Sequence, residues 1–155
     1  MPTSILIDAN LLVLLVVGLT DKRLIERHKN VSSYDADGFD LLVEKLKEFS
    51  EVLLTPNTLT EASNLLRQIG EPERERLTLT LGEFIKGRPE RYIPSEEASN
   101  EATFVRLGLT DAALMNVGRV SRPVLLSADR DLYLAASQEG FEALNFAHLY
   151  DAKFG

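Results

Sequence analysis

The sequence contains no cysteine, which excludes disulfides, thiolate metal sites and cysteine nucleophiles. It has only two histidines, His28 and His148, which argues against a histidine-based zinc site. His28 stands among charged residues and is predicted to be solvated, and His148 is predicted to pack or to face solvent. No Gly-x-Gly-x-x-Gly motif follows the first predicted strand, which argues against a dinucleotide-binding domain.

Basic residues are fewer than acidic ones. The 17 Lys and Arg residues stand against 24 Asp and Glu residues and give a net charge of −7. This balance argues against broad, charge-driven binding to nucleic acid or to an anionic membrane. It leaves room for a local basic path, but a solvated helix face explains the candidates equally well. These candidates are Arg67, Arg74, Arg76, Lys86, Arg88 and Arg91.

The chain has no long hydrophobic run. Residues 11–19 are apolar, but they are too few to span a bilayer. No Lys or Arg precedes them and Asp8 stands just before them, unlike in a signal peptide. We therefore expect a cytoplasmic protein without membrane contact. A chain of 155 residues, 45% of them hydrophobic, fits one domain spanning residues 1–155.

Short apolar runs alternate with helical patterns along the chain. Residues 4–7, 52–54, 124–127 and 141–146 are predicted strands, and most of the segments between them have helical spacing. Gly18 is predicted to end the first helix. This alternation predicts an α/β fold, with a parallel sheet of about four or five strands and helices on both faces.

Acidic residues follow three of the predicted strands. Asp8 ends the first, Glu61 lies in the helix after the second, and Asp129 lies in the exit turn of the third. Asp111 begins a helix just before the third strand. Open α/β sheets bind ligands at this edge. Taken singly, Asp8 is explained by a turn and Glu61 by the helix dipole.

Four carboxylates at one edge would repel one another unless cations were bound. Mg²⁺ or Mn²⁺ suits such a site, because both prefer oxygen ligands. Two metal ions held in this way can activate water and stabilise the leaving oxygen in phosphodiester cleavage. On this reasoning, neutralising Asp8 should relieve repulsion in the metal-free protein. Asn10, two residues after Asp8, is a candidate N-cap for the first helix.

The chain resembles the PIN-domain nucleases in four blocks that occur in the same order and at similar separations. The blocks are ILIDAN (residues 5–10), TPNTLTEASN (residues 55–64), LGLTDAAL (residues 107–114) and VLLSADRD (residues 124–131). Each block alone is weakly specific, but the ordered set of four covers almost the whole chain. The resemblance implies a single PIN-like domain.

The resemblance also implies an endoribonuclease that depends on Mg²⁺ or Mn²⁺. Its metal-binding and catalytic residues would be Asp8, Glu61, Asp111 and Asp129. Asn10 and Ser127 match supporting polar positions, and Asp131 is either a further ligand or, as we favour, a charge at a helix start.

The chain's size resembles that of the toxin ribonucleases of toxin–antitoxin pairs, although residues 18–38 are longer than in the compact form. This implies an RNA substrate, a possible antitoxin and a homodimer, with residues 77–85 as a candidate interface.

Two other functions remain open. A PIN scaffold that has lost catalysis would bind RNA or a protein partner without cutting it, although all four acids are present here. A phosphate-handling regulator, such as a receiver domain or a phosphatase, would pair two acids at the end of the first strand. Residues 8–10 have only one acid, and no lysine follows a late strand in the expected context.

Overall fold

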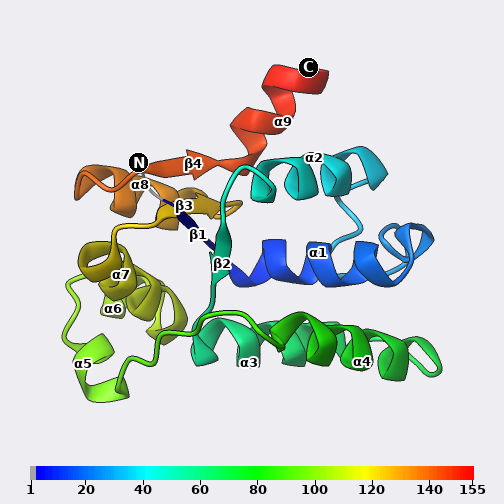
Figure 1. Ribbon diagram of the computed structural model, residues 1–155, viewed down its shortest axis with the longest axis horizontal. Coiled ribbons are helices and arrows are strands. Elements are labelled where there is room, and N and C mark those ends of the chain that lie inside the picture. Colours follow the sequence, from blue (N-terminus) through cyan, green and yellow to red (C-terminus); the bar gives the residue numbers. More distant parts are fainter. Residues whose placement is uncertain (1–2) are drawn as a thin grey trace.

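The computed structural model describes residues 3–155, in which strands and helices alternate (Figure 1). The strands are β1 (Ser4–Ile7), β2 (Glu51–Leu53), β3 (Val124–Ser127) and β4 (Ala143–Asn145). The longer helices are α1 (Ala9–Thr20), α2 (Ala36–Leu46), α3 (Pro56–Leu66), α4 (Glu73–Ile85), α7 (Leu109–Ser121), α8 (Arg130–Gln138) and α9 (Phe146–Phe154). The connecting segments contain a short 3₁₀ helix, η1 (Lys22–Leu24), and two short α-helices, α5 (Ser95–Ser99) and α6 (Phe104–Leu107).

The four strands form one sheet in the order β2-β1-β3-β4, and every neighbouring pair is parallel. β1 is central, since Leu6 is in register with Leu53 on one side and with Leu125 on the other. All the strands therefore end at the same edge of the sheet. The predicted parallel α/β sheet is confirmed, with four strands in residues 3–155.

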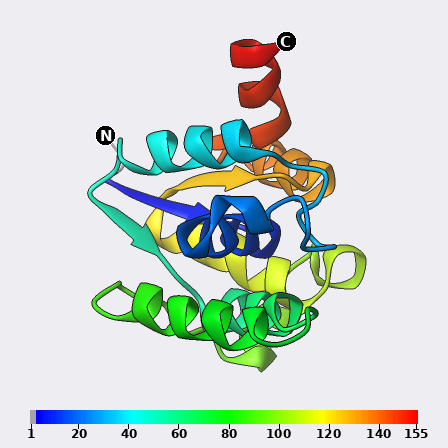
Figure 2. The same ribbon diagram turned by 90° about the vertical axis from the view of Figure 1, so that its right-hand side faces the viewer.

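Helices cover both faces of the sheet, as predicted. Ile5 and Ile7 point into a core shared with α1, α2, α3 and α4, whereas Leu6 points into a core shared with α7 and α8. This follows from the alternation of side chains along a strand. Figure 2 shows α1 in front of the sheet and α7 behind it. Three of the four residues of β1, Ile5 to Ile7, are apolar and buried, as expected for a strand that is covered on both sides.

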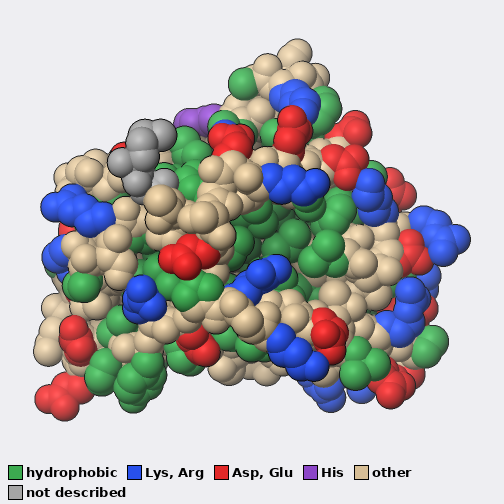
Figure 3. All heavy atoms as spheres, in the orientation of Figure 1, with side chains coloured by type: hydrophobic (Ala, Val, Ile, Leu, Met, Phe, Trp, Pro, Cys, Tyr) green, Lys and Arg blue, Asp and Glu red, His purple; other side chains and the backbone are tan. Residues whose placement is uncertain are grey.

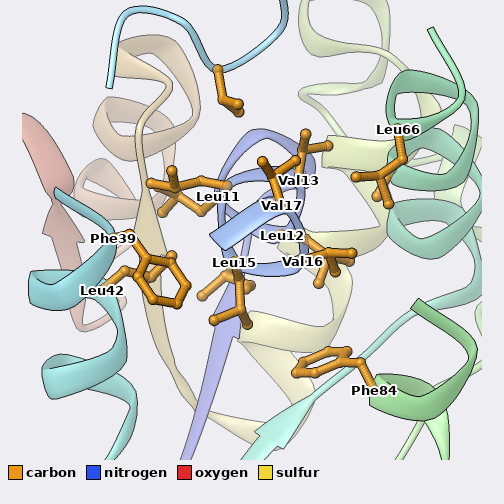
Figure 4. Close-up of a cluster of buried hydrophobic side chains, with 14 of the residues drawn as sticks. Leu11, Leu12, Val13, Leu15, Val16, Val17, Phe39, Leu42, Leu66 and Phe84 are labelled. Carbon is orange, nitrogen blue, oxygen red and sulfur yellow. The ribbon is translucent and has the colours of Figure 1, made fainter. Parts of the chain in front are cut away.

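Helix α1 is the centre of the larger core. Its residues from Leu11 to Val17 are all buried, as expected for a helix that is apolar all round. Figure 4 shows α1 side chains among Phe39 and Leu42 of α2, Leu66 of α3 and Phe84 of α4. The first helix thus packs against α2, α3 and α4, as well as against the sheet.

The two ends of α1 differ from the prediction. Its N-cap is Asp8, whose Oδ1 accepts a hydrogen bond of 2.9 Å from the Leu11 amide, while Asn10 lies exposed in the first turn. Gly18 lies inside the helix, where the Phe39 ring packs against its α-carbon. The glycine is there because two helices approach closely, so it does not end the helix.

His28 was predicted to be solvated, and this was wrong. The ring is fully buried, with Nε2 3.1 Å from the Leu66 carbonyl oxygen, and Nδ1 accepts a bond of 3.3 Å from the Asn30 amide. These partners require a neutral ring with its proton on Nε2. His28 therefore fastens the segment between η1 and α2 to the end of α3. His148 is exposed and contacts the Tyr133 ring edge to face.

The proposed interface segment, residues 77–85, is largely used inside the molecule. Leu77, Leu81 and Phe84 are buried against the core, whereas Leu79 is 65% exposed. Only part of this segment is therefore available to a partner. Within residues 3–155, no helix has the length and apolar character that crossing a membrane would require.

Candidate functional site

The four acids predicted from the sequence come from elements that meet at the carboxyl edge of the sheet. Asp8 directly follows β1, and Asp129 stands two residues after the end of β3. Glu61 lies in α3, which begins shortly after β2, and Asp111 lies in the first turn of α7. We call this set, Asp8, Glu61, Asp111 and Asp129, the acid edge.

Asp8 is buried and both its oxygens accept hydrogen bonds. Oδ1 caps α1, while Oδ2 accepts from the Ser127 hydroxyl at 2.6 Å and from the Ala128 and Asp129 amides at 2.8 Å and 3.3 Å. Burial raises the pKa of Asp8 above its ordinary value, and these bonds act in the opposite direction. Asp8 therefore ties the end of β1 to the exit loop of β3. Ser127, one of the predicted supporting residues, thus hydrogen-bonds directly to Asp8.

Asp111 has the opposite environment. No donor among residues 3–155 hydrogen-bonds to its carboxylate, which is only partly exposed to solvent. Burial, and then the negative charges of Asp129, Asp8 and Glu61, raise the pKa of Asp111 to about 7. Asp111 is thus close enough to the other three acids to experience their charge. The charges of the other three acids thus add to the effect of burial on Asp111.

Asp129 and Glu61 leave oxygen atoms free. Oδ1 of Asp129 caps α8 by accepting from the amides of Asp131 and Leu132, at 2.8 Å and 3.2 Å. No donor among the described residues binds Oδ2 of Asp129, and Glu61 is exposed. Asp131 lies exposed in the first turn of α8, the place of a helix-start charge.

The donor chemistry of the acid edge fits Mg²⁺ or Mn²⁺, because the available ligands are carboxylate oxygens that repel one another. The acidic side chains, however, lie farther apart than the ligands of one bound ion. In residues 3–155, no three acidic or histidine side chains lie close enough together to hold one ion as they stand.

A groove of about 450 Å³ adjoins Glu61. Its walls come from the start of α3, from residues 92–95 and from Thr110, next to Asp111. Tyr92 lines this groove and is 75% exposed, and no sequence pattern singled it out. Tyr34 was also missed: burial, and then the charge of Asp8, raise the pKa of Tyr34.

A somewhat larger hollow, of about 490 Å³, lies at the opposite edge of the sheet, where residues 3–4, 121–123 and 140–142 approach the starts of the strands. None of the four acids lines it. The acid edge and the groove beside it are therefore the better candidate site, because charge, burial and free oxygen ligands coincide there.

Comparison with known proteins does not add to this picture. A scan against protein-family models gives no match to the chain, and a search of curated proteins gives no similar sequence. The fold and the site define a class only: an α/β protein with a parallel sheet, in which Asp111 is influenced by the charges of three other acids from the carboxyl edge.

Proposed function

We propose that the protein is an endoribonuclease of the PIN type that depends on Mg²⁺ or Mn²⁺. One observation carries this proposal: the half-buried carboxylate of Asp111 has no hydrogen-bond donor among the described residues, and the charges of three other acids raise its pKa. A bound cation would remove that repulsion. The ordered sequence blocks and the parallel α/β fold are both compatible with the same assignment.

The residues of the acid edge have separable parts in this proposal. Asp111, Glu61 and Oδ2 of Asp129 would hold the ion, and Asp8 would add a ligand through Oδ1, which accepts only one hydrogen bond. Ser127 and the amides of residues 128–129 hold Asp8 in place. The ion, once bound, would lower the pKa of water and stabilise the charge of the phosphate. Asp131 would act only through its charge at the start of α8, and Asn10 would contribute only an exposed polar side chain in the first turn of α1.

Incubation of the purified protein with a panel of single-stranded and structured RNAs tests the proposal. We expect cleavage in Mn²⁺ or Mg²⁺ that leaves 5′-phosphate and 3′-hydroxyl ends. Asp111→Asn and Glu61→Gln should each lose most of the activity, and Asp131→Asn should keep it. Cleavage that persists in excess EDTA, or cyclic phosphate ends, would reject a metal-dependent mechanism.

A scaffold that binds RNA or protein without cutting is the second candidate. It is favoured by two observations: the oxygens of Asp8 are occupied by internal donors, and no three acids yet surround one point in residues 3–155. Under this assignment the protein would bind the same RNAs, and the bound RNA would remain intact in the presence of Mn²⁺.

The expected protein partners, an antitoxin or a second copy of the chain, would need an apolar surface. Figure 3 shows hydrophobic side chains in a hollow between α2 and α4. An open cleft of about 280 Å³ lies there, lined by Leu15 and Leu19 of α1, Val43 of α2 and Phe84 of α4, among others. Leu19 is 51% exposed. These apolar residues support a partner surface that lies mostly outside the candidate segment, residues 77–85, and shares only Phe84 with it.

A further inference from the structure

Tyr92 is a large aromatic side chain that the fold leaves in water. It is 75% exposed, although its neighbour Ile93 is partly buried in the core around α7. An exposed aromatic ring beside a candidate active site is informative, because aromatic rings are the surfaces on which unpaired nucleobases stack. Tyr92 lines the groove together with Glu61, one member of the acid edge.

The backbone before Tyr92 is held firmly. The Leu54 amide donates to the Pro89 carbonyl oxygen at 3.0 Å, and the Arg91 amide donates to the Leu54 carbonyl oxygen at 2.7 Å. Leu54 and Glu90 thus form a parallel bridge that continues the sheet just beyond β2. Tyr92 follows this bridge directly, at the edge where the strands end. The backbone that leads into Tyr92 is thus tied to the sheet, which lowers the cost of ordering the chain when a base stacks on the ring.

Apart from Pro56 and Ile93, the rest of the groove lining is polar and nearly uncharged. The lining side chains include two amides and three hydroxyls: Asn57, Asn64, Thr60, Ser95 and Thr110. Among these lining residues, Glu61 is the only charged one and none is Lys or Arg. Such a surface cannot follow a run of phosphates, but it can hydrogen-bond the edges of a base or a ribose hydroxyl.

We propose that this groove binds an unpaired nucleobase next to the scissile phosphate, with the base stacked on the Tyr92 ring. The inference rests on the proposed ribonuclease function and specifies its substrate as RNA that is single-stranded at the cut. A paired base offers no free face, so double-stranded RNA is excluded from the groove. Because no basic residue lines the groove, base binding depends more on stacking than on ionic contacts with phosphates.

Binding measurements in EDTA test the stacking without any cleavage. The affinity of a fluorescent single-stranded RNA would be measured for the parent, Tyr92→Phe, Tyr92→Ala and Phe154→Ala. Phe154 is a matched control, an aromatic residue 42% exposed at the end of α9. We expect Tyr92→Ala to bind about tenfold to a hundredfold more weakly. Tyr92→Phe should bind within about twofold of the parent, because phenylalanine keeps the aromatic face on which a base stacks. Phe154→Ala should also bind within about twofold of the parent, because Phe154 does not line the groove.

An abasic scan identifies the stacked base. Removing the base adjacent to the mapped cut should weaken binding by the parent but not by Tyr92→Ala, since the stacking partner is already absent there. Equal losses in both proteins at every position would overturn the inference.

Cleavage assays separate this inference from the proposed function. If the parent cuts RNA and Tyr92→Ala leaves KM and kcat unchanged, the stacking proposal fails while the ribonuclease stands. If the parent binds RNA through Tyr92 but cuts none in Mn²⁺, the base-binding groove stands and the ribonuclease fails. If the parent binds no RNA, the groove has no such role.

Discussion

At the scale of single residues, the acid edge contains two carboxylates with opposite environments. Asp8 has four hydrogen-bond donors around it, and Asp111 has none among the described residues. The sequence alone makes them look equivalent, as acids at the ends of neighbouring elements. The donors to Oδ2 of Asp8 come from a loop about 120 residues away, and only the folded sheet brings that loop close. We therefore expect neutralisation of Asp111, and not of Asp8, to relieve charge repulsion in the metal-free protein.

Asp8→Asn should destabilise the metal-free protein. The amide keeps one acceptor, so either the α1 cap or the bonds from the β3 exit loop must be lost, and a buried NH₂ group faces another donor. We expect the free energy of unfolding to fall by about 1–2 kcal/mol. Urea unfolding at pH 7 in EDTA would measure this, with exposed Asp131→Asn as the control. A more stable Asp8→Asn would show that the cost of burying the charge exceeds the value of the bonds.

Asp111 should make the stability of the metal-free protein fall as the pH rises. The folded pKa is about 7, against an ordinary value of 3.8, so between these values the native state keeps a proton that the unfolded chain has released. Stability then decreases with pH by at most about 1.4 kcal/mol per pH unit for this proton, and the loss levels off above pH 7.

Asp111→Asn should remove that part of the slope, while Asp131→Asn should keep it. Urea unfolding from pH 4 to pH 8 in EDTA gives the comparison. Parallel curves for the parent and Asp111→Asn would show that the carboxylate does not retain its proton in the native state.

At the scale of elements, two glycines show what a sequence pattern can and cannot predict. Gly18 and Gly82 both lie within helices, in α1 and α4. A methyl group on Gly18 would overlap the Phe39 ring, whereas nothing lies within 4 Å of the position that a methyl group on Gly82 would occupy. Tertiary contact alone distinguishes them. The same holds for His28, whose charged neighbours predict solvent but whose ring is buried against α3.

Gly18→Ala and Gly82→Ala should therefore change stability in opposite directions. Gly18→Ala forces α1 and α2 apart and should cost about 1–3 kcal/mol. Gly82→Ala lowers the entropy of the unfolded chain and should add about 0.4–1 kcal/mol. Thermal melts of the two variants and the parent would measure both effects. A Gly18→Ala protein as stable as the parent would mean that Phe39 moves away without cost.

Much of the fold followed from periodicity, because short apolar strands and amphipathic helices are local patterns. The strands β1 and β3 were predicted at residues 4–7 and 124–127, where they lie in the structure. The cap of α1 was predicted wrongly, as Asn10, because the bonds that hold Asp8 come partly from the distant exit loop of β3. The groove at Tyr92 could not be predicted, because it depends on the bridge between Leu54 and Glu90.

At the scale of the whole molecule, the net charge of −7 and the acid edge have a common consequence. An excess of negative charge destabilises the compact state by self-repulsion, most strongly where acids are crowded. Cations that bind only the native state would offset this repulsion. We therefore expect metal binding to raise the stability of the folded protein, whether or not an RNA substrate is present.

The melting temperature of the parent should rise with Mn²⁺ concentration. Binding to the native state alone stabilises it by RT ln(1 + [L]/Kd), or about 2.7 kcal/mol at a hundredfold excess over Kd. Asp111→Asn should lose most of this rise, because Asp111 is the acid on which the other three charges act. Asp131→Asn should keep the rise, because Asp131 lies exposed at the start of α8. Melts of the three proteins, in EDTA and across a Mn²⁺ titration, provide the measurement. An equal rise in all three would indicate nonspecific cation screening, and no rise up to millimolar Mn²⁺ would favour the scaffold that binds without cutting.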